Sequence, residues 1–162
     1  EMQIAIEALL AEHGYDHYET SAFAKPGKQA RHNLNYWQFG DYLGIGAGAH
    51  SKLSYHDKIC REVRTKHPKA YMEKSLACQA VEREWAIDKD ELGFEFMMNA
   101  LRLIDGVPLN LFQARSGLSL DTLRVALKKA QDKGLLLLEN QTLKPTLLGQ
   151  RFLNDLLELF LN

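Results

Sequence analysis

The densest group of chemically useful side chains lies in one short stretch, Arg31–Ser51, which reads RHNLNYWQFGDYLGIGAGAHS. Its first part contains the polar and aromatic residues His32, Asn33, Asn35, Tyr36 and Trp37. A neutral imidazole is a good ligand for haem iron or another transition metal, so His32 is the candidate iron ligand. Tyr36 and Trp37 could stack on a flat macrocycle, and the asparagines could hydrogen-bond to a ligand or hold the loop. A histidine in a polar loop is often only solvated, and that alternative stays open for His32.

The second part of the stretch is rich in glycine and ends at a histidine. Its glycines are Gly40, Gly44, Gly46 and Gly48. We expect a strand over residues 42–50 with one bare face, which allows a ligand or another backbone to approach closely. His50 at its end is either a ligand contact or a structural histidine bonded to a backbone carbonyl. The glycine spacing is not the dinucleotide-binding fingerprint, because the following helix is absent.

The acidic residues near the cluster and the two cysteines are weaker candidates for a functional site. Glu19 and Asp41 are the acids nearest to the cluster, and we expect solvated or turn-capping roles for both. Cys60 and Cys78 have no metal-type spacing and are predicted to be free thiols. An iron–sulfur cluster normally needs three or four thiolates, so we expect no such metal site in this chain.

The composition is that of a soluble globular protein. The chain has 162 residues, of which 46% are hydrophobic and 25% charged, and its net charge is −1. This balance does not favour a polyanion or an anionic membrane surface as a partner. The sequence shows no transmembrane segment and no signal peptide, so we expect a cytoplasmic protein. Residues 1–13 are already amphipathic without a start methionine or a capping residue, and we therefore expect a fragment of a longer protein.

The elements that must position the cluster have an α/β pattern up to residue 87. A helix over residues 1–13 ends near Gly14 and leads into a strand at 15–20, the repeating unit of an α/β layer fold. We predict a turn at 23–28, mostly irregular structure up to Asp41, and a surface β-excursion or hairpin at 52–66. A helix should begin at Pro68 and run to Cys78. Residues 77–88 are expected to link the two halves of the chain.

From residue 88 onward the pattern is helical. We predict helices at 90–104, with Asp90 as the N-cap, and at 109–114 and 119–133. Two short strands at 135–139 and 142–145 and a closing helix at 147–161 complete a winged-helix-like domain of residues 88–162. Such a domain raises the question of DNA binding. Its nine Lys and Arg against ten Asp and Glu give no basic footprint, so we expect no nucleic acid partner.

Three motifs resemble a known family. YETSAFAKPG, RHNLNYW and GDYLGIGAGAHS are similar to the C-terminal part of the radical SAM proteins that resemble oxygen-independent coproporphyrinogen III oxidase. The His-Asn-x-x-Tyr-Trp run, here His32, Asn33, Tyr36 and Trp37, is similar to the branch called HemW, described as haem chaperones. The tail ELGFEFMMNALRLIDGV and the winged-helix-like part resemble the C-terminal domain of the same family.

The resemblance implies an architecture and cofactors. Residues 1–87 would be the last βα units of a partial radical SAM barrel, and the missing N-terminal part would hold a 4Fe–4S cluster and S-adenosylmethionine. By the same resemblance, Leu34, Asn35 and His50 fall where the decarboxylating relatives contact S-adenosylmethionine. His32, Asn33, Tyr36 and Trp37 are the haem-binding candidates.

The resemblance also implies a function in haem and porphyrin metabolism. The first hypothesis is haem binding and delivery. The alternative is oxidative decarboxylation of coproporphyrinogen III to protoporphyrinogen IX by the full-length enzyme, and a DNA-binding regulator is a distant third. Without the cluster cysteines the chain should be catalytically inactive alone. An apolar face left exposed by the missing barrel could also mediate dimerisation.

Overall fold

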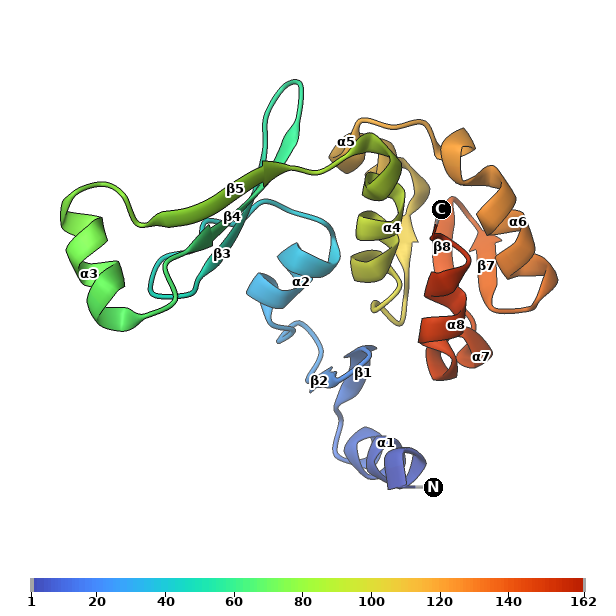
Figure 1. The fold of residues 1–162 in the computed structure, drawn as a ribbon. Coiled ribbons are helices and arrows are strands. Elements are labelled where there is room, and N and C mark those ends of the chain that lie inside the picture. The colour runs from blue at the N-terminus through green and yellow to red at the C-terminus, as the bar shows by residue number, and fades with distance from the viewer. Residues whose placement is uncertain (1, 162) are drawn as a thin grey trace. The chain divides into compact units, whose positions relative to one another are not determined.

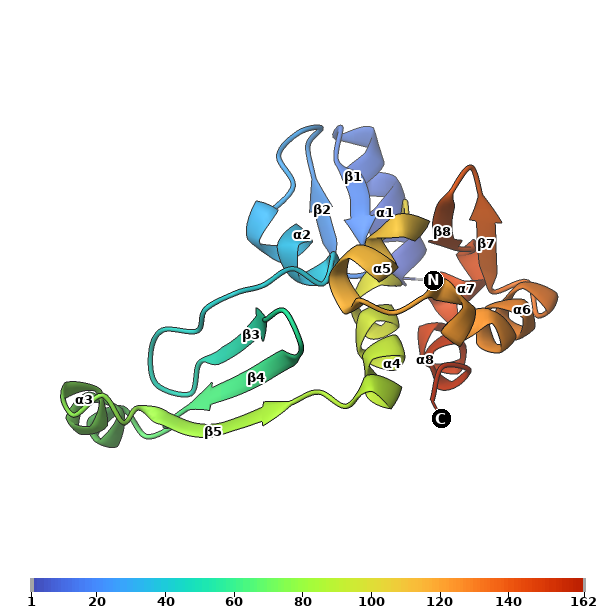
Figure 2. The ribbon, with the colours of Figure 1, turned by 90° about the horizontal axis from the view of Figure 1, so that it is seen from above.

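The computed structural model describes residues 2–161, which form two compact units. The first unit combines the residues up to Phe39 with those from Gly93 onward, and the second unit comprises Gly40–Leu92. Figures 1 and 2 show the course of the chain through both units.

The first unit begins with a helix and a short hairpin. Helix α1 (Met2–Glu12) has no buried residue, and several of its apolar side chains are exposed. Strands β1 (Asp16–Glu19) and β2 (Ala22–Ala24) pair antiparallel. The predicted first helix and first strand are confirmed, whereas β2 occupies the start of the stretch predicted as a turn.

Helix α2 (Arg31–Trp37) replaces the irregular structure that we predicted there. Its backbone bonds run from the Leu34 amide to the Ala30 carbonyl and from the Gln38 amide to the Leu34 carbonyl. The segment contains no glycine, proline or β-branched residue, so nothing in it opposes a helix. The prediction was wrong because polar composition says little about a short helix whose end is held by tertiary packing.

The rest of the first unit is helical around a small sheet. It contains α4 (Lys89–Ala100), which the unit shares from Gly93 onward, α5 (Leu109–Ser116), the 3-10 turn η1 (Leu120–Leu123) and α6 (Arg124–Asp132). Strands β6 (Val107–Pro108), β8 (Thr142–Pro145) and β7 (Leu136–Glu139) form an antiparallel sheet in that order, and α7 (Leu147–Arg151) and α8 (Leu153–Glu158) close the chain. In Figure 1 the β7–β8 hairpin lies beside α6.

The core of this unit consists of fully buried apolar side chains from α4, α5, the sheet and α8. Its most buried members are Phe96, Met97, Leu101, Phe112, Leu136, Leu143 and Leu156. Their burial supplies the main stabilisation of the unit, since each large apolar side chain contributes about 1.5–3 kcal/mol.

Three details of the predicted helices in this half were wrong. Helix α4 ends at Ala100 rather than Ile104, and Asp90 lies in its first turn instead of capping it, because the Asp88 carbonyl already accepts the amides of Glu91 and Leu92. The closing helix is interrupted at Phe152, which has φ −115° and ψ 46°. The predicted helix from 119 to 133 is present as η1 followed by α6.

The second unit is a three-stranded antiparallel sheet with one helix. Strands β3 (His50–Ser54), β4 (Ile59–Arg64) and β5 (Val81–Ala86) lie in that order, and α3 (Pro68–Leu76) connects β4 to β5. Figure 2 shows α3 at the end of the sheet where β4 stops and β5 begins. The predicted hairpin and the predicted helix at Pro68 are confirmed, and β5 occupies the segment that we expected to be only a link.

The glycine-rich strand is absent. Residues 42–49 form a loop, and strand β3 begins only at His50. Among the described residues, the loop forms one isolated β-bridge, between Tyr42 and Lys52. The glycine-rich sequence therefore encodes a folded-back loop rather than a bare strand.

Candidate functional site

The predicted site residues of helix α2 lie on two sides of the helix. Successive residues of a helix are rotated by roughly 100° about its axis. His32 and Tyr36 are four positions apart, as are Asn33 and Trp37, so these residues share one side. Leu34 and Asn35 point to the other side. The haem-binding candidates of α2 therefore lie on one side of the helix, and Leu34 and Asn35 lie on the other. An irregular loop would not separate the two groups in this way.

His32 is the most accessible of the haem-binding candidates. Its side chain is exposed, and its ring meets the Tyr36 ring edge-on with the centroids 4.6 Å apart. Within residues 2–161 no hydrogen bond engages either ring nitrogen of His32. An exposed imidazole with uncommitted nitrogens fits the requirement for an axial ligand of haem.

The remaining residues of that side are less exposed. Tyr36 is half-buried, and its ring lies 6.4 Å from that of Trp37, centroid to centroid. Asn33 is also half-buried, and its amide makes no hydrogen bond to the described residues. Trp37 faces the protein: its indole nitrogen is buried without a hydrogen-bond partner in the described structure. The accessible part of this side is therefore the end that carries His32.

Arg102 holds Trp37 from outside the motif. The Arg102 guanidinium lies over the Trp37 ring, 4.3 Å from its centroid, which is a favourable cation–π geometry. The same guanidinium donates two hydrogen bonds to Glu19 Oε2, from Nε at 3.2 Å and from Nη2 at 3.0 Å. Ser21 donates to the other oxygen of Glu19 through its amide and its hydroxyl, at 3.0 and 2.7 Å. Both oxygens of a carboxylate that is only 2% exposed are thus satisfied.

This arrangement corrects the expectation for Glu19. The residue does cap a local turn through Ser21, but it is buried and ion-paired rather than solvated. Glu19 and Arg102 lie in two different stretches that resemble the family, but neither stretch gave these residues a role. The alternation of the strand that carries Glu19 was a weak signal for one buried face, and nothing in the sequence linked this strand to Arg102.

A row of phenylalanines fixes the end of α2. Phe39 is 1% exposed and packs edge-to-face on Phe96, which packs in the same way on Phe112. The centroid distances are 5.7 and 5.1 Å, within the range of favourable aromatic pairs. Phe39 adopts a left-handed φ of 55°, which turns the chain out of the helix. The C-terminal end of α2 is therefore held by Trp37 and Phe39, while the His32 end is exposed.

His50 and the glycine loop belong to the second unit. His50 is exposed at the start of β3, opposite Val63, and its ring makes no hydrogen bond to residues 2–161. A Cβ atom on Gly44 would lie 2.2 Å from the His50 carbonyl oxygen, so glycine is required there by the chain's own backbone. The Gly44 amide donates to Ser51 Oγ, and the Gly46 amide donates to the Tyr71 hydroxyl. Close backbone packing explains Gly44 and a positive φ of 115° explains Gly46, so neither glycine requires a ligand-facing strand.

Asp41 and Lys52 form a second charged pair that the sequence did not reveal. Lys52 Nζ lies 2.9 Å from Asp41 Oδ1, and the lysine side chain is only 2% exposed. Ser54 donates to both carboxylate oxygens of Asp41. Partial burial acts to raise the pKa of Asp41, but the hydrogen bonds from Lys52 and Ser54 and the lysine charge outweigh it and leave that pKa below its ordinary value. Asp41 therefore stabilises the base of the glycine loop.

The described residues do not fit an iron–sulfur cluster. Cys60 is buried in β4, Cys78 is exposed after α3, and both are free thiols, as predicted. No group of three or more potential metal ligands occurs among residues 2–161. None of the helices described here combines the length and the apolar character that crossing a bilayer requires.

The chain is similar in sequence to one family model and to several known proteins. Residues 87–152 match the family model of the HemN C-terminal domain. Over 94% of its length, the chain is 44% identical to the haem chaperone HemW of Escherichia coli and 44% identical to that of Haemophilus influenzae. It is also 34% identical, over 93% of its length, to the mitochondrial radical S-adenosyl methionine domain-containing protein 1 of Bos taurus.

The chain spans about two fifths of each of these relatives: 40% and 39% of the two HemW proteins and 36% of the bovine protein. Among solved structures, coproporphyrinogen III oxidase (HemN) from Escherichia coli, a radical SAM enzyme, has a similar fold. The TM-score is 0.66 at 19% identity, and the match covers 98% of this chain and 39% of that one. Residues 87–152 therefore match the model of the HemN C-terminal domain, and most of the chain is similar to one part of the HemW proteins, the resemblance that its motifs predicted.

Proposed function

We propose that this chain forms part of a protein that binds haem and delivers it to an acceptor, and that α2 supplies the haem-binding side. The observation that carries the proposal is the shared side of α2, where an exposed imidazole with uncommitted nitrogens lies beside an aromatic ring. The high identity to HemW proteins supports the same function. Haem is the cargo in this proposal.

In haem binding, each residue on this side of α2 would have a separate role. His32 would ligate the haem iron, and Tyr36 would contact the macrocycle beside it. Asn33 would donate its amide hydrogens to the cargo. Trp37, which Arg102 covers, would set the orientation of α2 rather than contact the iron. Because His32 is exposed, the cargo could leave without unfolding the helix, which suits delivery better than permanent retention.

The opposite side of α2 is proposed for a different contact. We infer that Leu34 and Asn35 face S-adenosylmethionine held by the part of the longer protein that carries the 4Fe–4S cluster. By the same resemblance, His50 is proposed separately as a contact of that cofactor. The exposed apolar side chains of α1, including Met2, Ile4 and Leu9, would be covered by that part. A second copy covering the same face is the alternative, and the oligomeric state of the longer protein distinguishes the two.

The proposed domain organisation follows the sequence pattern. We propose that residues 88–162 act as a winged-helix-like domain and residues 1–87 as the end of a partial barrel with a surface β-excursion. The match of residues 87–152 to one family model supports a boundary at this position, and the order α5, η1–α6, β7 and β8 supports the winged-helix-like description. A cytoplasmic location and the absence of a nucleic acid partner stay predictions.

Oxidative decarboxylation of coproporphyrinogen III is the second candidate function. The similar fold of the Escherichia coli coproporphyrinogen III oxidase favours it. The 44% identity to HemW against 19% to that enzyme favours haem delivery instead. If decarboxylation is the function, the longer protein with an intact cluster should release carbon dioxide from coproporphyrinogen III, and no release would exclude it.

The test of haem delivery is a haem titration of the longer protein followed by the Soret band. His32→Ala should weaken haem binding by at least tenfold, which corresponds to about 1.4 kcal/mol. His56→Ala is the matched control, because His56 is also an exposed histidine and lies outside α2. If His32→Ala binds haem as tightly as the unchanged protein does, α2 does not supply the iron ligand.

A further inference from the structure

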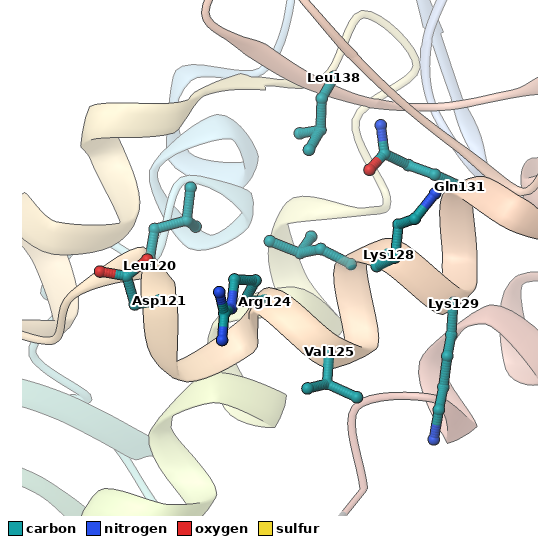
Figure 3. A pocket seen from close by; sticks show the side chains of 9 residues that line it. Leu120, Asp121, Arg124, Val125, Lys128, Lys129, Gln131 and Leu138 are labelled. Carbon is teal, nitrogen blue, oxygen red and sulfur yellow. The ribbon is translucent and has the colours of Figure 1, made fainter.

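The HemN C-terminal domain carries an open groove that the haem-binding proposal does not use. The groove lies along η1 and α6 and includes Leu138 from β7, and it encloses about 630 Å³. This volume is within the range of sites that hold a ligand or a partner's side chains. Figure 3 shows Leu138 extending from its strand toward the helix that carries Arg124 and Lys128.

The groove has an apolar lining on an otherwise polar helix. Leu120, Val125, Leu127 and Leu138 all line it. Val125, the second residue of α6, is 65% exposed, although a polar residue would be expected on a solvated side of a helix. Exposed apolar side chains beside partly buried ones form the kind of surface that another chain covers.

The charges on the groove are predominantly basic. Arg124, Lys128 and Lys129 line it, against one acid, Asp121. Asp132 already neutralises Lys128 at 2.6 Å, and Asp121 is engaged by the Ser119 hydroxyl at its own turn. Arg124 and Lys129 form no ion pair with any residue between 2 and 161. Arg124, Lys128 and Lys129 therefore outnumber Asp121, the one acid that lines the groove, and give the edge of this apolar surface a net positive charge.

We propose that this groove binds an acidic amphipathic helix of a partner protein. Apolar side chains of the partner at positions i, i+3, i+4 and i+7 would fill the space between α6 and Leu138. Its acidic residues would pair with Arg124 and Lys129 and determine which partners associate. Duplex DNA is a poorer fit, because phosphates gain nothing from the apolar lining and Asp121 lies within the groove.

The test is a selection of peptides on the full chain. A library of random peptides of about 16 residues, long enough for a helix, is selected for binding and the enriched sequences are measured by fluorescence anisotropy. We expect enriched peptides with a helical apolar spacing and a net negative charge. Val125→Asp and Arg124→Glu should each weaken their binding by at least tenfold. Leu138→Asn provides a second change in the apolar lining, from the strand side.

Matched controls separate the groove from general surface effects. Leu147→Asp removes an apolar side chain of nearly equal exposure, 62%, from outside the groove, and Lys133→Glu reverses a nearby charge that does not line it. Both should leave peptide binding within twofold. Peptides without negative charge, peptides insensitive to Val125→Asp, or no enrichment at all would each overturn the proposal. Binding of a random DNA duplex at physiological salt that Arg124→Glu abolishes and Val125→Asp does not would identify a nucleic acid site instead.

Discussion

Arg102 lies over the Trp37 ring, with its guanidinium carbon 4.3 Å from the ring centroid, while the same guanidinium is paired with the buried carboxylate of Glu19. One side chain thus links the end of α2 to β1. The backbone reinforces this link, because the Arg102 carbonyl accepts both the amide and the hydroxyl of Thr20. The orientation of the proposed haem-binding side therefore depends on a residue far from it in the sequence.

Replacing Arg102 should destabilise the protein strongly. In Arg102→Met the Glu19 carboxylate stays buried without a counter-charge, and breaking a buried pair from one side costs about 3 kcal/mol. Urea unfolding of the variant and of the unchanged chain measures this loss. The fluorescence of Trp37 should also change, because the cation above its ring is removed.

The double variant Glu19→Gln with Arg102→Met is the control for this interpretation. It removes both charges together, so it should be more stable than Arg102→Met alone. A double-mutant cycle that includes Glu19→Gln measures the interaction energy of the two side chains. If Arg102→Met unfolds within about 0.5 kcal/mol of the unchanged chain, the ion pair is not important for stability.

Phe39 should matter as much for stability as a core residue does. Phe39→Ala removes a ring that is 1% exposed and packs against Phe96, and such a truncation costs about 4 kcal/mol. Equilibrium unfolding monitored by circular dichroism tests this expectation. Phe152→Ala truncates the same residue type at a position that is 51% exposed, and it should cost much less. Equal losses for the two variants would contradict the role of Phe39 in holding α2.

The glycine loop should tolerate change poorly at one position. In Gly44→Ala the new Cβ would approach the His50 carbonyl oxygen to 2.2 Å, and the backbone would have to shift at a cost of about 2 kcal/mol. Faster amide exchange in β3, measured by NMR, should accompany the lower stability. Ala47→Ser, an exposed position in the same loop, is the control. A Gly44→Ala variant as stable as Ala47→Ser would show that the close approach is not needed.

Much of the order of elements could be predicted from local sequence signals. Gly14 and Gly134 follow the ends of α1 and α6 with left-handed φ angles, and Pro68 begins α3, so these boundaries were accessible. Local signals also gave the β7–β8 hairpin around Asn140 and Gln141. These features rest on backbone preferences of single residues, which do not depend on the rest of the fold.

The organisation of the candidate site was less accessible, because it depends on contacts between distant segments. The motif residues were recognised, but their helix was not, since α2 is short and its end is held by Phe39 and Arg102. The glycine loop was predicted as a strand because the alternation of small and large residues is the same in both. The packing that distinguishes them, between Gly44 and the backbone of His50, is a tertiary contact.

The pair of Asp41 and Lys52 should make stability depend on pH. The pKa of Asp41 is lowered in the folded state, so its contribution is fully present above the pKa of an unfolded aspartate, about 3.9, and is lost as the pH falls through the lower folded value. Asp41→Asn should therefore be less stable than the unchanged chain at pH 6, because it removes the carboxylate that pairs with the buried Lys52 ammonium. The difference between the two should shrink as the pH is lowered from about 4 toward 2.

Thermal unfolding across this pH range measures the effect. Asp57→Asn removes the same charge from the exposed turn between β3 and β4, and it should follow the unchanged chain throughout. If the difference between Asp41→Asn and the unchanged chain stays constant as the pH falls, the carboxylate of Asp41 does not stabilise the loop through its charge. A constant difference would instead assign the effect to the hydrogen bonds that Ser54 donates to the two Asp41 oxygens, because asparagine has only one oxygen that can accept them.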